Sequence, residues 1–144
     1  MKNRILAMLL SLVVVSACAA PEQEQLLSFP QATIQLADVK RTVQLADTPE
    51  LRERGLMFQK SAEPGMLLLY PEPRLISLWM RNTDLALDVA FIDPQWRIMA
   101  IVQLHPLDET PVSAPSAALA ALEMPRGWFA ERNIQVGEKL KLVR

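Results

Sequence analysis

Four residues near the middle of the chain could recognise a ligand. They are Trp79, Arg81, Asn82 and Thr83, which lie where an apolar run ends and a turn is expected to begin. Asn favours turns because its side chain can imitate a backbone turn and because it tolerates a positive φ. A strand–turn–strand corner with Trp79 in the core is therefore one interpretation. In the other, the flat face of Trp79 lies beside the Asn82 amide, as aromatic walls and fixed polar groups do in small-ligand pockets.

A carboxylate follows in the next expected strand. Asp88 alternates with apolar residues and shares a face with the small residues Ala86 and Ala90, which leave room beside it. If that face meets solvent, Asp88 is an ordinary outer position. If the face lines a cleft, Asp88 becomes a hydrogen-bond acceptor or an acid–base group.

A second carboxylate interrupts an apolar run. Glu123 lies within residues 119–124, and a buried carboxylate needs a partner, for which we expect Arg54 or Arg81. A structural ion pair and a role in ligand binding or catalysis are both consistent with this position. With Asp88, Glu123 could hydrolyse a glycoside if the two groups stood about 5–9 Å apart.

Composition excludes several other kinds of chemistry. One Cys and one His cannot form a disulfide framework or a Cys/His zinc site, and four Gly residues form no phosphate-binding loop. The one histidine, His105, is expected at an exposed strand end. With 15 basic and 16 acidic residues the chain has no strong positive field, which argues against a nucleic-acid partner. We expect no cofactor and no bound metal.

The N-terminus has the pattern of a secretion signal. Lys2 and Arg4 precede the apolar run 5–15, which is too short to span a bilayer but fits the core of a signal peptide. Cys18 follows Ser and Ala, an arrangement that resembles the lipobox of bacterial lipoproteins, where the thiol takes a diacylglyceryl group. An ordinary cleaved signal with an incidental Cys is the alternative.

The lipobox interpretation predicts both organisation and location. Residues 1–17 would be the signal, 18–30 the acylated Cys with a flexible tether, and 31–144 a single domain. Acyl chains would make the membrane a partner of the protein. Ala19, rather than Asp, follows the Cys, and by the sorting rule of Gram-negative lipoproteins this favours the outer membrane, facing the periplasm.

The remaining chain is strand-rich. Residues 33–38 and 42–47 alternate apolar with polar residues and predict a hairpin, and Thr48-Pro49 with a later Gly55 predicts a helix of about two turns. Further strands are expected at 66–70, 75–80, 85–92, 98–104 and 139–143, with a helical turn at 127–132. Residues 106–115 predict a loop, and 117–124 fits either helix or strand. The predicted fold is mainly β: a compact, jelly-roll-like sandwich or barrel with one or two short helices.

Several stretches together resemble a bacterial and archaeal family known as domain of unknown function 192. The most specific is Trp-Met-Arg-Asn-Thr at 79–83, and the others lie at 54–58, 65–67, 87–88, 91–93, 122–123, 127–128 and 134–137. The resemblance implies a compact β-rich domain of jelly-roll type and no established activity. The chain departs from the family pattern at Leu78, Ala86, Trp96, Pro125 and Arg126.

Three functions remain open on this evidence. The first is a lipid-anchored module that binds a small ligand or a polymer segment through Trp79, Asn82, Asp88 and Glu123. The second is an interaction protein that docks an envelope component, and the third is a hydrolase that uses the two acids. The binding hypothesis requires the tryptophan–asparagine corner and both carboxylates to converge on one hollow.

Overall fold

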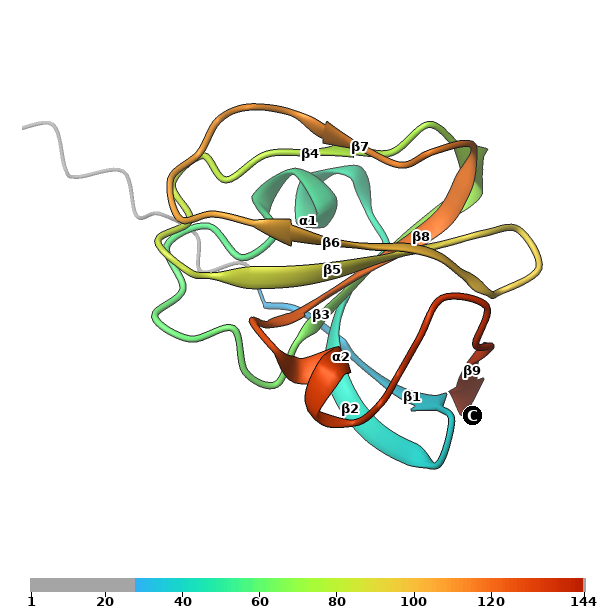
Figure 1. The fold of residues 1–144 in the computed structure, drawn as a ribbon. Helices are drawn as coiled ribbons and strands as arrows, with labels where there is room; N and C mark the ends of the chain where they lie inside the picture. Colours follow the sequence, from blue (N-terminus) through green and yellow to red (C-terminus); the bar gives the residue numbers. More distant parts are fainter. Residues whose placement is uncertain (1–27, 144) are drawn as a thin grey trace, which may run out of the picture.

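The computed structural model describes residues 28–143. The predicted signal, Cys18 and most of the predicted tether lie outside the described residues. The regular structure of the described chain is mainly strand, with two short helices (Figure 1). The elements are β1 Gln31–Leu36, β2 Val39–Ala46, α1 Pro49–Arg54, β3 Met66–Arg74, β4 Ser77–Leu78, β5 Leu87–Ile92, β6 Ile98–Leu104, β7 Val112–Ser113, β8 Ala118–Pro125, α2 Trp128–Glu131 and β9 Leu140–Val143.

Seven strands form one curled sheet. Their order is β6-β5-β8-β3-β2-β1-β9, and β2–β3 is the parallel pair among antiparallel neighbours. The outer strands β6 and β9 are joined by a bridge between Arg97 and Lys139, just before each strand begins. The prediction of a mainly β sandwich or barrel with one or two short helices is confirmed.

Both faces of the sheet are buried against apolar side chains. One cluster, which includes Leu68, Met80 and Val89, lies on the face covered by α1 and β4. The other, which includes Leu36, Leu122 and Phe129, lies on the opposite face with α2. Strands buried on both faces read as continuous apolar runs, which explains the composition of β3, β5 and β8.

The first helix forms as its sequence predicts. The Thr48 hydroxyl accepts a hydrogen bond from the Leu51 N–H at 3.3 Å, and Pro49 occupies the first turn. At the other end the Gly55 N–H donates to the Leu51 carbonyl at 2.9 Å, with φ at +46°, a value that Gly adopts without strain. Leu51 is buried and holds the helix against the sheet.

Two segments differ from the simplest expectation. The run 75–80 forms only the two-residue strand β4, which pairs with β7 inside the expected loop 106–115. The ambiguous segment 117–124 is the central strand β8, because pairing with β3 on one side and β5 on the other outweighs the helix preference of its alanines. No helix among residues 28–143 is long and apolar enough to cross a membrane.

Candidate functional site

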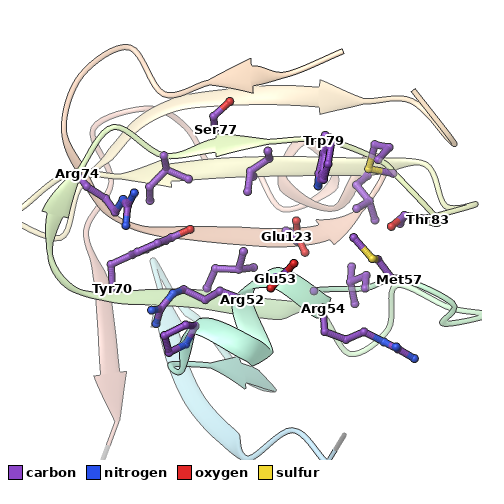
Figure 2. Close-up of a pocket in the computed structure, with 18 of the residues that line it drawn as sticks. Arg52, Glu53, Arg54, Met57, Tyr70, Arg74, Ser77, Trp79, Thr83 and Glu123 are labelled. Carbon is purple, nitrogen blue, oxygen red and sulfur yellow. The ribbon is translucent and has the colours of Figure 1, made fainter. Parts of the chain in front are cut away.

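A cleft of about 390 Å³ lies over the sheet face that bears Glu123. The strands β3, β5 and β8 form its floor through Leu68, Leu87 and Glu123. The helix α1 and the turn after it form one wall, and residues 74–80, which include β4, form the other. Figure 2 shows Tyr70 and Arg52 along one side and Ser77 and Trp79 along the other, with Glu123 between them.

Glu123 is the buried acid at the floor of this cleft. Glu123 is 7% exposed, and its Oε2 atom has no hydrogen-bond partner within the described part of the chain. The expected ion pair with Arg54 or Arg81 does not form among these residues. Burial raises the pKa of Glu123 to about 7, because the charged form loses its hydration. Near neutral pH the group can therefore either donate or accept a hydrogen bond.

One side of the cleft combines arginine with tyrosine. The Arg52 Nη1 donates to the carbonyls of Asp47 at 2.6 Å and Leu69 at 2.8 Å, which fixes the end of α1 against the sheet. The Arg52 guanidinium lies 4.6 Å from the centroid of the Tyr70 ring, and that of Arg74 lies 5.6 Å from it. Burial raises the pKa of Tyr70, and the two cations oppose part of that rise.

The other side carries the predicted corner. Trp79 is 46% exposed, so it is not a core residue, and its side chain offers a surface at the rim of the cleft. The Thr83 hydroxyl donates to the Arg81 carbonyl at 3.1 Å, and the Thr83 N–H donates to the Met80 carbonyl. Asn82 has a φ of +54°, as expected of Asn in a turn. The corner is thus a real turn that also positions an indole at the cleft.

A second hollow adjoins the first. It has a volume of about 340 Å³ and shares Glu53, Arg54, Met57 and Trp79 with the cleft, while Arg81 and Asn82 belong to the second hollow alone. The Arg54 guanidinium lies 4.7 Å from the Phe58 ring centroid. Of the predicted residues, Trp79, Thr83, Arg54 and Glu123 therefore share the cleft, and Arg81 and Asn82 are its neighbours.

Asp88 lies apart from all of them. In the register of β5 and β8, Glu123 stands opposite Val89 and Asp88 stands opposite Met124, so the two carboxylates point to opposite faces of the sheet. Asp88 Oδ2 accepts a hydrogen bond from the Gly127 N–H at 2.8 Å, and Oδ1 lies 3.1 Å from Arg126 Nε. The two acids do not face one another across a gap, and the two-carboxylate hydrolase loses its geometry.

Similarity to known proteins agrees with this architecture. Residues 32–142 match the family DUF192, which is described as "Uncharacterized ACR". The chain belongs to the DUF192 family. Every residue of the cleft lies within the matched range of this DUF192 domain. No curated protein matches the chain significantly.

Two solved structures extend the likeness to three dimensions. A protein from Sinorhizobium meliloti 1021, provisionally described as a transcription regulator, is 30% identical with a TM-score of 0.76, covering 81% of this chain and 96% of that chain. A protein of unknown function from Novosphingobium aromaticivorans DSM 12444 is 32% identical with a TM-score of 0.70, covering 88% of this chain and 94% of that chain. The fold is therefore shared with one bacterial protein provisionally described as a transcription regulator and with one of unknown function.

Sequence reasoning missed several residues of the DUF192 cleft. Arg52, Tyr70 and Arg74 were not candidates, because nothing in their local patterns separates them from an ordinary helix end or strand end. Arg126 was noticed only as a departure from the family pattern, yet it is the cation beside Asp88.

Within residues 28–143 no group of three or more His, Cys, Asp or Glu side chains is placed to hold a metal ion.

Proposed function

We propose that this DUF192 domain is a binding module whose cleft holds a small polar ligand or a segment of a polymer at Glu123. The observation that carries the proposal is the Oε2 atom of Glu123, which is buried beneath a cavity of about 390 Å³ and has no hydrogen-bond partner among residues 28–143. A buried polar atom left without a partner costs about 1–3 kcal/mol. A ligand that hydrogen-bonds Glu123 would recover that energy.

The surroundings of Glu123 suit such a ligand. Tyr70 and Trp79 provide aromatic surface, and Arg52 and Arg74 add cations on the Tyr70 side. Small-molecule sites combine apolar walls with a few placed polar groups, and a strongly shifted pKa in a cleft is frequent at functional sites. These features support binding. Asp88, the second acid of the predicted hydrolase, is not among the residues that line the cleft, and Glu53 is the other acid that lines it.

A ligand screen tests this proposal on the full chain in mild detergent. A library of small polar compounds, including amines, sugars and amino acids, is scored by the shift in unfolding temperature. We expect hits whose affinity falls by about tenfold or more in Trp79→Ala and in Glu123→Gln. The control is Val136→Ala, which removes an exposed apolar side chain outside the cleft. Hits that bind all three variants equally, or a screen without hits, would overturn the proposal.

We also propose that the chain is a lipoprotein held in the cell envelope through Cys18, facing the periplasm and anchored in the outer membrane. The proposal rests on the N-terminal pattern, in which the only cysteine of the chain stands where a lipobox would place it. A Cys18→Ala variant expressed in a Gram-negative host should move from the membrane fraction to the soluble fraction. Retention of the variant in the membrane fraction would contradict lipid anchoring.

A further inference from the structure

We propose that the polymer segment taken by this cleft is an extended acidic peptide that adds a strand to the open edge of β4. This inference rests on the proposed binding function and names its ligand class. Strand addition supplies affinity through main-chain hydrogen bonds and specificity through pockets for alternate side chains. This domain has both an open strand edge, on β4, and a cleft that could accept side chains beside it.

The backbone of β4 has one used edge and one open edge. The Ile76 carbonyl accepts a hydrogen bond from the Ala114 N–H, and the Met80 N–H donates one to the Asp108 carbonyl, each at 2.8 Å. The backbone N–H and C=O groups of alternate residues therefore point towards the β7 side. In an antiparallel pair the residues between them point the other way. The N–H and C=O groups of Ser77 and Trp79 accordingly face away from β7, and they have no partner among residues 28–143.

This open edge borders the cleft. All the residues from Arg74 to Met80 line the cavity, whereas Val112 and Ser113 of β7 do not. A strand that presented a face to the cavity would contribute alternate residues, and a strand that presents its edge contributes consecutive ones. β4 therefore separates the cleft from β7, and its unpaired groups lie along the cleft. Figure 2 shows Ser77 and Trp79 on the segment that borders it.

Charge favours an acidic segment over a neutral or basic one. The cleft is lined by three arginines, Arg52, Arg54 and Arg74, against one exposed acid, Glu53, and the buried Glu123 is largely protonated below about pH 7. Side chains of an added strand alternate, with successive same-face positions about 7 Å apart. One acidic side chain can thus meet the arginines while another hydrogen-bonds Glu123.

A sugar polymer would use Trp79 and Glu123 but not the strand edge. Saccharides lack the regular alternation of N–H donors and carbonyl acceptors that matches Ser77 and Trp79. The open edge is the feature that favours peptide over polysaccharide, and it is also the feature that substitution can test by itself.

The probe is a fluorescent, end-blocked heptapeptide of alternating glutamate and valine, titrated against the full chain in mild detergent. Two isomers of this peptide carry backbone N-methyl groups on alternate residues, one on the glutamates and the other on the valines. Only one set of N–H groups can face β4 in an added strand. We expect binding of the parent peptide and of one isomer, and loss of binding by the other.

The chain offers a matched pair of variants. Ser77→Pro removes the N–H that faces the cleft, and Ser113→Pro removes the equivalent N–H on the far edge of β7. Each variant also removes the same hydrogen bond between the two serine hydroxyls, and proline is tolerated at strand edges whose N–H is unpaired. We expect Ser77→Pro to weaken peptide binding by about tenfold, and Ser113→Pro by less than about twofold.

The outcomes separate this inference from the binding proposal. If both N-methyl isomers bind as well as the parent, or if the two proline variants bind equally, strand addition is wrong even where small-molecule hits persist. A sugar hit that depends on Trp79 but is unaffected by Ser77→Pro overturns the peptide assignment and leaves the cleft as a binding site. If the native chain binds neither the peptide nor any compound of the small-molecule library, both proposals are overturned. If Ser77→Pro does not fold, the N-methyl isomers decide.

Discussion

The two faces of the sheet each bury one carboxylate, and the two differ in what they contact. Asp88 and Glu123 lie on neighbouring strands and are 5% and 7% exposed. Asp88 is held by a backbone N–H and by the cation Arg126, whereas Glu123 Oε2 lies under a cavity without a partner in the described chain. Each acid has one buried oxygen without a hydrogen bond among residues 28–143, Asp88 Oδ1 and Glu123 Oε2, but Asp88 Oδ1 lies beside a cation whereas Glu123 lies beneath a cavity. We therefore expect Asp88 to stabilise the fold and Glu123 to be available to a ligand.

The largest effect is expected at Asp88, the acid that pairs with a cation. Asp88→Ala leaves the Gly127 N–H without its acceptor and Arg126 without its counter-charge, and we expect the free energy of unfolding to fall by about 4 kcal/mol. Urea unfolding measures the loss. Asp88→Asn keeps an oxygen for the Gly127 N–H and should lose roughly half as much. An alanine variant as stable as the native chain would show that Asp88 has no structural role.

The second effect is a pH dependence that belongs to Glu123. Its pKa in the folded state, about 7, lies above the usual 4.5, so the folded state holds the proton more tightly and stability falls as pH rises from about 4.5 to about 7. Glu123→Gln has no carboxyl group to titrate and so removes this loss. Between pH 4.5 and pH 8, the free energy of unfolding should therefore fall by about 3 kcal/mol less in Glu123→Gln than in the native chain. Unfolding free energies measured across this range test the difference.

The control for this titration is an exposed glutamate. Glu109→Gln changes a residue outside the cleft and should leave the pH profile parallel to that of the native chain. If the Glu123→Gln profile is also parallel, the carboxyl titrates normally and the contrast between the two faces disappears.

The smallest of the three effects concerns the wall of the cleft. Arg52→Met removes two hydrogen bonds to backbone carbonyls and should lower the free energy of unfolding by about 2 kcal/mol. It should also raise the pKa of Tyr70 further, because one of the opposing cations is lost. Tyr70 is the only tyrosine, so its absorbance titration is unambiguous. Arg74→Met is the control for stability, and equal losses in both variants would show that the carbonyl contacts of Arg52 contribute nothing.

Local patterns predicted most of the elements. The cap of α1 and strand β6 lie where Thr48 and an apolar run indicated, and the predicted β1–β2 hairpin forms with its turn at 37–38, a few residues earlier than expected. These features depend on residues that are close together in the sequence, and so they can be predicted from one sequence alone. The mainly β fold followed from the number and spacing of such elements.

The composition of the cleft could not be predicted in the same way. Whether Asp88 and Glu123 share a face depends on the register of β5 against β8, and a shift of one residue would have put both on one side. Neither strand specifies that register by its own alternation, because both are apolar on both faces. Tyr70 and Arg52 meet only because α1 packs beside β3, a contact between segments whose local patterns give no sign of it.

The position of β1 in the sheet affects how the domain would bear mechanical load. The first strand pairs with β2 along six residues and with β9 along four, so the N-terminal strand is interior rather than at an edge. A pull on the chain before Gln31 therefore acts on two hydrogen-bonded ladders at once. Detaching β1 requires both to rupture, so the fold is reinforced against a pull on its N-terminal end.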